Sequence, residues 1–336
     1  MNGLMDHPFS KSTSFTERCK RLREVVSPED SLCILIDADP DAMASALALK
    51  RFFWRKVRKT EIYHINPIQR GDNLAFIKLL KVEQRPIRDL RPSEVTRWAI
   101  LDSQPQHHKE FADQQFDIII DHHPIGPLSK AYFVDIKESY GANSTILTEY
   151  LRASKIRPSP RLATALFYGI KTDTNNFVRE CLPNDINAFR YLYPLTNMNI
   201  IKKIESSEMT KEMLANYRVG MDRLKIVRHV AFVHMGEVKN PDILVIIADF
   251  FMGLAEATWS VVSGIFEERL TVILRNAGFK SNAGKVAERL FKQLGGSGGG
   301  HRSAARAEIP LDAISKEIKG TSNIAKFIRK RLKTLN

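Results

Sequence analysis

The chain has 336 residues, 43% of them hydrophobic, so it is long enough for two folded domains with separate cores. Its 51 basic and 38 acidic residues leave a formal net charge of +13, which favours polyanionic partners such as nucleotides or nucleic acid. The three cysteines lack the close spacing of a disulfide framework or a thiolate zinc site and fit a reducing cytoplasm, and the lack of any apolar run of about 18 residues argues against a membrane partner.

The first strong signal along the chain is a strand followed at once by three carboxylates. Apolar residues 31–36 predict a buried strand, and an alanine-rich helix is expected over 42–55. Asp37, Asp39 and Asp41 lie between these elements at alternate positions, where their mutual repulsion is tolerable mainly if a cation neutralises it. One of the acids could instead cap the helix. Because a cap needs only one acid, the group of three favours a metal site.

Two further predicted strands also end in carboxylates. Strand 97–101 ends at Asp102, and strand 116–120 runs into Asp121-His122-His123. Ligands of open α/β sheets bind at the carboxyl ends of the strands, which is where these side chains are expected. A His-His pair alone is as often a capped turn as a metal site, so the tripeptide gains its weight from the other acids.

A further acid stands at the end of a mostly apolar helix predicted over 161–170. Asp173 follows this helix between Thr172 and Thr174, and we expect the two hydroxyls to hold the carboxylate. An earlier helix opens at Asn143-Ser144, where capping by one of these side chains is favoured over anion binding by free amides. The other elements expected in this half are helices over 17–26 and 72–80 and strands over 61–66 and 131–134.

The alternation of strands and helices over 31–180 predicts a doubly wound, mainly parallel α/β sheet. The pattern changes to helices from residue 183 to about 224, which predicts a connector, and a smaller α/β domain is expected beyond it. We therefore predict a metal-binding catalytic domain over 1–183, a helical connector over 184–224 and a substrate-binding domain over 225–336. The expected elements after residue 183 are helices over 185–192, 199–206, 209–224 and 283–294, strands over 230–235, 243–247, 257–265 and 270–274, and a basic terminal helix over 316–333 with a solvated face.

A glycine run over 295–300 ends in His301 and Arg302. Such a run could be a flexible linker. Here it lies between two predicted helical segments inside a domain. Glycines let the backbone approach a phosphate, a helix N-terminus offers free amides, and the histidine and arginine add positive charge. We therefore predict that this segment binds phosphate.

Carboxylate and imidazole ligands without thiolates suit manganese, with magnesium or iron less favoured and a structural zinc site disfavoured. The first domain supplies more acids than one ion needs, which suggests two ions roughly 3.5–4 Å apart and metal-assisted phosphoester hydrolysis as the reaction class. The candidate ligands are Asp37, Asp39, Asp41, Asp102, Asp121, His122, His123 and Asp173.

In combination and in order, these motifs resemble those of a DHH-family phosphoesterase with the DHH-associated C-terminal domain. The resemblance covers most of residues 31–310. It implies a DHH domain followed by a smaller α/β domain across a cleft. The motifs that carry it are Asp37-Ala38-Asp39-Pro40-Asp41-Ala42, Leu101-Asp102-Ser103, Asp121-His122-His123-Pro124, Gly169-Ile170-Lys171-Thr172-Asp173-Thr174 and Gly298-Gly299-Gly300-His301-Arg302-Ser303-Ala304-Ala305.

The resemblance also implies a role for each ligand. Asp39 would hold the first ion and Asp41 the second, with Asp102 bridging both. His122 and Asp173 would complete the shell of the second ion. The family often has a histidine four residues before its first aspartate, but Leu35 stands there. Asp37 would take its place, as in the RecJ-type nucleases of the family.

Substrate contacts are implied in both domains. His123 would contact phosphate, so that Asp102, His122 and His123 form the catalytic group, while Asp121 orients the histidine pair. In the C-terminal domain, Gly299, Gly300 and His301 match the phosphate-binding loop of the family, Arg302 adds charge, and Arg275 matches a basic substrate contact. Arg306 stands where members usually have another glycine.

The compact two-domain organisation favours a manganese-dependent phosphodiesterase or phosphomonoesterase that acts on very short oligonucleotides (nanoRNA) or on pAp. A RecJ-type exonuclease normally adds a domain that grips single strands, which does not fit into the roughly 30 residues after His301. A phosphodiesterase for cyclic or linear signalling dinucleotides and a non-catalytic nucleotide-binding regulator remain as further candidate functions. The family also suggests a homodimer formed through the first domain.

Overall fold

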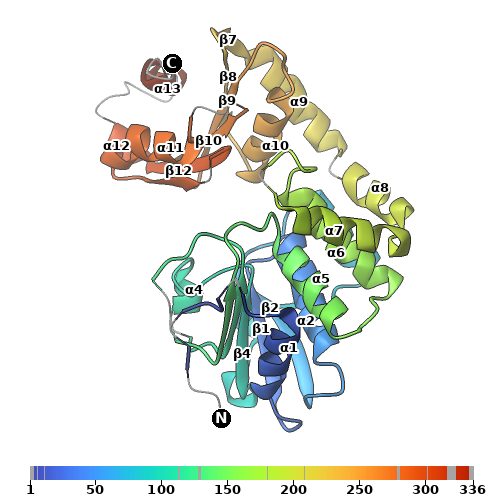
Figure 1. Ribbon diagram of the computed structural model, residues 1–336. Coiled ribbons are helices and arrows are strands. Elements are labelled where there is room, and N and C mark those ends of the chain that lie inside the picture. The colour runs from blue at the N-terminus through green and yellow to red at the C-terminus, as the bar shows by residue number, and fades with distance from the viewer. Residues whose placement is uncertain are drawn as a thin grey trace. The chain divides into compact units, whose positions relative to one another are not determined.

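The computed structural model describes residues 4–5, 7–10, 12–112, 114–127, 130–179, 181–207, 209–277, 281–300, 302–315 and 323–332. The chain divides into two compact units, Met1–Glu208 and Met209–Asn336, and each has its own six-stranded sheet (Figure 1). In the described ranges, none of the helices combines the length and the apolar character needed to cross a bilayer.

The sheet of the first unit is parallel throughout and has the strand order β3-β2-β1-β4-β5-β6. Because β1 and β4 are neighbours although β2 and β3 come between them in sequence, the chain reverses its direction of winding at this pair. In doubly wound folds, ligands bind at the carboxyl ends of the two strands where this reversal occurs, which are β1 and β4 here. The strands are β1 (Ser31–Ile36), β2 (Lys59–His64), β3 (Arg85–Pro86), β4 (Arg97–Leu101), β5 (Ile118–Asp121) and β6 (Phe133–Ile136).

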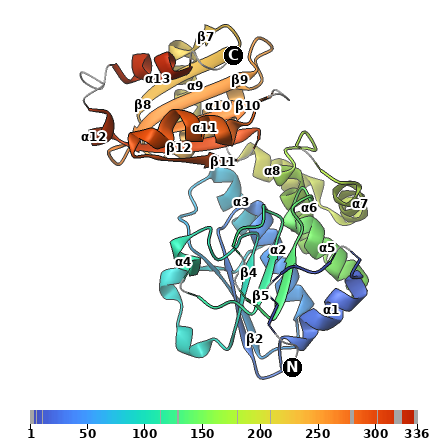
Figure 2. The same ribbon diagram turned by 60° about the vertical axis from the view of Figure 1, so that its left-hand side comes forward.

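Helices α1, α2 and α5 lie on one face of this sheet and the short α4 on the other (Figure 1, Figure 2). The helices of the unit are α1 (Phe15–Glu24), α2 (Pro40–Phe52), α3 (Gly71–Leu80), α4 (Lys109–Ala112), α5 (Asn143–Ala153), α6 (Pro160–Asp173), α7 (Pro183–Leu192) and α8 (Met198–Ser206).

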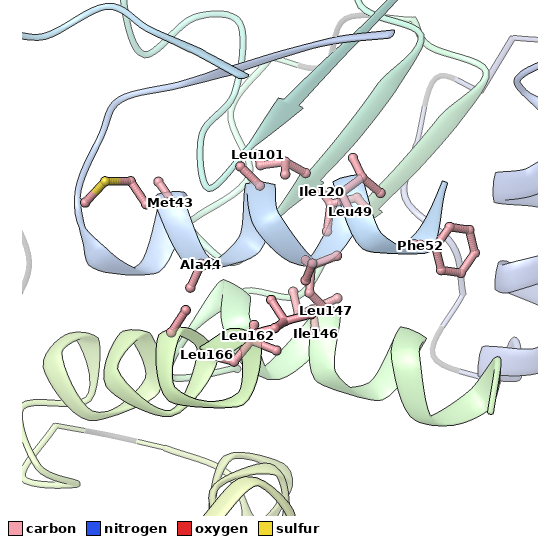
Figure 3. Packing of buried hydrophobic residues seen from close by; sticks show 14 of the residues in the cluster. Met43, Ala44, Leu49, Phe52, Leu101, Ile120, Ile146, Leu147, Leu162 and Leu166 are labelled. Carbon is pink, nitrogen blue, oxygen red and sulfur yellow. The ribbon is translucent and has the colours of Figure 1, made fainter. Parts of the chain in front are cut away.

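Helix α2 is central to the core. It lies between the sheet residues Leu101 and Ile120 and the helical residues Ile146 and Leu162, as Figure 3 shows. Its small residues, such as Ala44, are fully buried and let the neighbouring helices pack closely. This packing fixes the N-terminus of α2 at the carboxyl end of the sheet.

The sheet of the second unit has the order β11-β12-β10-β9-β8-β7 and is antiparallel except for the pair β8 and β9. Its elements are α9 (Lys211–Arg223), β7 (Lys225–Val227), β8 (Val230–Glu237), α10 (Asp242–Phe251), β9 (Trp259–Phe266), β10 (Arg269–Asn276), α11 (Ala283–Phe291), β11 (Ser297–Gly300), β12 (Ala304–Pro310), α12 (Leu311–Ile314) and α13 (Ile324–Leu332).

Two sequence-based expectations for this unit were wrong. The apolar run 243–247 was predicted to be a strand but lies within α10, whose buried stripe of Leu244, Ile247 and Phe251 has helical spacing. The glycine run was expected between two helical segments, yet Ser297–Gly300 is an edge strand paired with β12. The sequence after the glycines therefore forms a strand and provides no helix N-terminus.

Candidate metal centre

The parallel sheet brings together the ends of three strands. β1 pairs with β4, and β4 pairs with β5, so the residues that follow them share one edge of the sheet. Asp37 and Asp39 follow β1, Asp102 follows β4, and His122 and His123 follow β5. The expectation that these acids and imidazoles are gathered at strand ends is confirmed by this topology.

Asp102 lies at the centre of the cluster. Its backbone has a φ of 56°, in the left-handed region that few residues other than glycine adopt, and its amide donates to the carbonyl of Ile120 at 3.0 Å. This conformation turns the carboxylate toward β5, where Oδ1 lies 3.2 Å from Nε2 of His122 and 3.9 Å from Nδ1 of His123. Burial, reinforced by the charge of Asp41, raises the pKa of Asp102 well above its usual range.

His122 presents one nitrogen to two carboxylates. Its Nδ1 lies 3.0 Å from the carbonyl oxygen of Tyr140, so Nδ1 carries the proton and donates it. Its Nε2 then faces Oδ2 of Asp173 at 3.0 Å and Oδ1 of Asp102 at 3.2 Å. Burial opposes the charged ring, but the two carboxylates outweigh it and raise the pKa of His122 well above its usual range.

Asp41 is buried and binds the start of helix α5. Its two carboxylate oxygens accept from the amides of Asn143 at 2.6 Å and Ser144 at 2.8 Å. The expectation that Asn143 or Ser144 caps this helix was wrong, because α5 makes no hydrogen bond to its own cap side chain and uses Asp41 instead. Burial and the charge of Asp173 raise the pKa of Asp41 to about 6.

Asp39 caps α2, because its Oδ1 accepts from the amide of Ala42 at 2.8 Å. Desolvation by the surrounding protein, followed by the charges of Asp173 and Asp41, raises the pKa of Asp39 to about 7. The side chain is nevertheless exposed to solvent. An ion that arrives from solvent can therefore reach this carboxylate.

Asp37 lies at the outer side of the cluster and is about two-fifths exposed. Its Oδ2 is 3.4 Å from Nε2 of His108, which belongs to the loop after β4. Burial raises its pKa, with the charge of His108 acting in the opposite direction. His108 was not singled out from the sequence, because a histidine in a polar loop has no periodic pattern that marks it.

His123 is held by a buried acid and an amide. Its Nδ1 lies 2.8 Å from Oδ1 of Asp121, and Oδ2 of the same carboxylate accepts from Gln104 at 2.6 Å. Despite burial, these contacts lower the pKa of Asp121 to about 2. Burial opposes the charged form of His123, but its bond to Asp121 and the charge of Asp102 raise the pKa of His123 to about 9. Asp121 is thus an anchor for His123 and faces the protein interior.

Asp173 is the last residue of α6. Besides His122, its carboxylate lies 3.5 Å from Nη1 of Arg179, which also donates to the carbonyl oxygen of Asp173 at 2.9 Å. The expectation that threonine hydroxyls hold this carboxylate was wrong. Thr172 donates to the carbonyl of Tyr168, and Thr174 donates to the carbonyl of Ile170, so both hydroxyls serve the helix backbone.

Asp185 supports the loop that carries the carbonyl of Tyr140. It is fully buried, and its carboxylate accepts from the amides of Gly141 and Leu182 and from the hydroxyl of Thr145, at 2.6–3.0 Å. Sequence reasoning missed this role, since Asp185 looks like an ordinary acid in the first turn of α7. The other supporting residues that sequence reasoning missed are Gln104, His108, Tyr140 and Arg179.

The predicted substrate contacts of the second unit are arranged as follows. Arg275 on β10 is tied to the carboxylate of Asp249, on α10, by Nε and Nη2. Gly299 and Gly300 pair with Arg306 and Ala305 in the β11–β12 ladder, whereas His301 lies outside the described residues. A side chain at position 300 would come within 2.4 Å of the Ala304 carbonyl oxygen, so glycine has a packing reason to be there.

Residues 31–170 match the DHH family, N-terminal domain, and residues 228–329 match the DHHA1 domain. The chain belongs to the DHH family. DHH-family members are hydrolases that act on phosphoester bonds, and DHH phosphoesterases use divalent metals.

Three proteins that resemble this DHH protein cover most of the chain. An uncharacterized protein of Methanocaldococcus jannaschii is 32% identical over 321 residues, which are 94% of this chain and 66% of that protein. An exopolyphosphatase-related protein from Bacteroides fragilis has a TM-score of 0.74 at 16% identity, covering 97% of this chain and 98% of that one. Exonuclease RecJ bound to manganese has a TM-score of 0.51 at 13% identity, covering 98% of this chain and 95% of that one. At these identities the two solved structures show the fold alone.

The residues of the DHH cluster fit divalent cations. Oδ1 of Asp102 and Nε2 of His122 are buried, and within the described part of the chain neither has a hydrogen-bond partner, so their 3.2 Å contact lacks the alignment of a hydrogen bond. Ligand atoms of Asp102, His122 and His123 lie within 4.8 Å of one another, as do those of Asp41, His122 and Asp173. The two groups share His122, and the pKa values of Asp41 and Asp102 are raised, so a bound cation would stabilise these two carboxylates in their charged form.

Proposed function

We propose that this DHH protein is a manganese-dependent phosphoesterase that hydrolyses very short oligonucleotides, pAp or both. The observation that carries the proposal is the position of His122, whose Nε2 faces Asp102 and Asp173 at 3.2 and 3.0 Å while Nδ1 is fixed by a carbonyl. A cation bound beside the two carboxylates would displace the Nε2 proton and take the Nε2 lone pair, while Nδ1 stays bonded to the carbonyl. Carboxylate and imidazole ligands favour manganese, with magnesium as the alternative.

In this proposal, Asp39 and Asp37 hold the first ion, and Asp41, His122 and Asp173 hold the second. Asp102 would contribute to the binding of both ions. When bound, divalent ions would lower the pKa of a water and neutralise charge on the phosphoryl oxygens.

The chain's own residues would orient the substrate. Asp121 keeps the His123 ring in one orientation and protonated near neutral pH, so that the ring can donate to a phosphoryl oxygen. Gly299, Gly300, His301 and Arg302 are proposed to bind a second part of the substrate. Arg275 would have to leave Asp249 or bind substrate beside it.

The proposal is tested by measuring the release of phosphate and mononucleotide, with manganese, from pAp, RNA dinucleotides, pGpG, cyclic di-AMP and a 20-nucleotide DNA strand. Asp102→Ala serves as the blank. We expect fast cleavage confined to pAp and the dinucleotides. Preferred degradation of the long strand would instead establish a RecJ-type exonuclease, and preference for pGpG or cyclic di-AMP a signalling phosphodiesterase. If no substrate is cleaved faster than by the blank, the proposal of an enzyme is refuted, and a nucleotide-binding regulator becomes the favoured hypothesis.

A further inference from the structure

A basic corner with an exposed tryptophan lies at the end of α2 that is remote from the metal centre. We call it the tryptophan corner and define it by Arg23, Arg51, Trp54, Arg55 and Lys56. Three helix ends meet there. The guanidinium of Arg23, on α1, lies 5.0 Å from the ring centroid of Phe52 and donates to Ser154, which follows α5, at 2.7 Å.

Trp54 is the distinctive residue of the corner. Its surface is 56% exposed, although a tryptophan that served only packing would be covered by the protein. The guanidinium carbons of Arg51 and Arg55 lie 4.8 and 4.3 Å from the centroid of the Trp54 ring. Two planar cations are therefore held against one exposed aromatic ring.

The positive charge of the corner is not neutralised locally. In the described part of the chain, no carboxylate lies within 4.0 Å of the charged nitrogens of Arg51, Arg55 or Lys56, whereas the adjacent Lys50 pairs with Glu83 at 3.4 Å. Compensation of the helix dipole accounts for the basic residues in the last turn of α2. It accounts neither for Arg55 and Lys56, which follow the helix, nor for an exposed indole.

We infer that the tryptophan corner binds single-stranded nucleic acid. The exposed part of the indole ring offers a stacking surface to unpaired bases, and the neighbouring guanidinium groups of Arg51 and Arg55, with Lys56, contact the phosphates. A duplex keeps its bases stacked on one another, so it would use the charges of the corner but not Trp54.

The length of α2 sets the size of strand that could touch both ends of the helix. Its 13 residues span about 20 Å, with Asp39 at one end and Trp54 just beyond the other. At about 3.4 Å per stacked nucleotide, a strand needs about six nucleotides to cover that distance. The dinucleotides and pAp of the proposed reaction are too short, so the tryptophan corner is a separate site and its existence does not depend on that reaction.

The test is the binding of a fluorescein-labelled 20-nucleotide single strand to the full chain in EDTA, followed by anisotropy at several salt concentrations. We expect Trp54→Ala and the double variant Arg51→Glu/Arg55→Glu each to weaken binding about tenfold. The double variant should also reduce the slope of log K against log salt by about 1.4, because about two phosphate contacts are lost. Arg88→Glu/Arg91→Glu, which makes the same charge change at exposed positions of the same unit, should weaken binding less than twofold.

Intrinsic fluorescence gives an independent readout. Of the three tryptophans, Trp54 is exposed, Trp98 is half-buried and Trp259 is buried. Stacking of the strand should quench the emission of the parent but not of Trp54→Phe. The inference is overturned if Trp54→Ala binds the strand like the parent, if a duplex of equal length binds as tightly and depends equally on Trp54, or if the corner binds anionic phosphatidylserine vesicles and no strand. Dinucleotide hydrolysis by Trp54→Ala, measured in parallel, reports on the proposed reaction separately.

Discussion

A methyl group added at Gly169 would test how closely helix packing controls the metal centre. The Cβ of an alanine there would lie 2.5 Å from Oγ of Ser144, 3.0 Å from Oδ1 of Asp41 and 3.1 Å from Cα of Asp41. Ser144 can rotate away, because its hydroxyl has no hydrogen-bond partner among the described residues. Asp41 cannot, since two amides of α5 hold its carboxylate. Helix α6 must therefore move by several tenths of an ångström.

This movement reaches the metal centre directly. Asp173 lies four residues after Gly169 on α6, on the same face of the helix and 3.0 Å from His122. Overpacking costs about 1–3 kcal/mol, while the higher helix propensity of alanine returns about 1 kcal/mol, so we expect a net loss of about 0–2 kcal/mol in unfolding free energy. The affinity for manganese should fall more clearly, by about 10–100-fold, as when the supports of metal ligands are altered.

Isothermal titration of manganese into Gly169→Ala and parent, together with urea unfolding, measures both effects. Gly220→Ala is the matched control, because its Cβ would meet only ordinary contacts at 3.4 Å or more. It should gain about 1 kcal/mol of stability and leave manganese binding unchanged. A Gly169→Ala variant that binds manganese like the parent would refute the proposed link between α6 packing and ligand geometry.

Three further changes are predicted. Asp102→Ala should abolish hydrolysis and reduce the number of bound manganese ions, and full activity in this variant would disprove its bridging role. Burial and Arg223 lower the pKa of His234 to about 4, so the unfolded chain takes up a proton below its pKa of about 6.5 while the folded chain does not. The unfolding free energy measured with urea should therefore fall by up to about 3 kcal/mol as the pH is lowered from 6.5 to 4. In His234→Gln the unfolding free energy should depend less on pH over this range, and equal pH profiles of the variant and the parent would contradict the prediction. Asp185→Ala leaves three donors without their acceptor and should cost about 3 kcal/mol or more of unfolding free energy, with Asp185→Asn intermediate, and a change below 0.5 kcal/mol would count against its supporting role.

The parallel sheet and its acidic strand ends were predictable because both follow from local patterns. Short apolar runs ending in aspartate identify buried strands, and parallel strands present their carboxyl ends at one edge. In contrast, the run 243–247 is rich in β-branched residues, which favoured a strand. The helix that formed is set by its longer span over Asp242–Phe251 and by packing of one face against the sheet.

The supporting contacts of the site could not be predicted because they join residues far apart in sequence. Asp41 reaches residue 143, Gln104 reaches Asp121, and Asp185 reaches back to Gly141. Asp41, Gln104 and Asp185 are common polar residues whose local sequences are compatible with solvent-exposed positions. Only the folded chain reveals that these three side chains are buried and paired.

The bond between Asp41 and α5 changes how related chains should be judged. A carboxylate that also starts a helix would be retained by selection for stability in a descendant that had lost its catalytic activity, and the same holds for Asp39 at the start of α2. The motif that contains Asp39 and Asp41 can therefore be retained after hydrolytic activity has been lost. In the described structure, the carboxylates of Asp102 and Asp173 do not cap a helix. Replacement of these two residues is therefore the better sign that a member of the DHH family has become a binding protein.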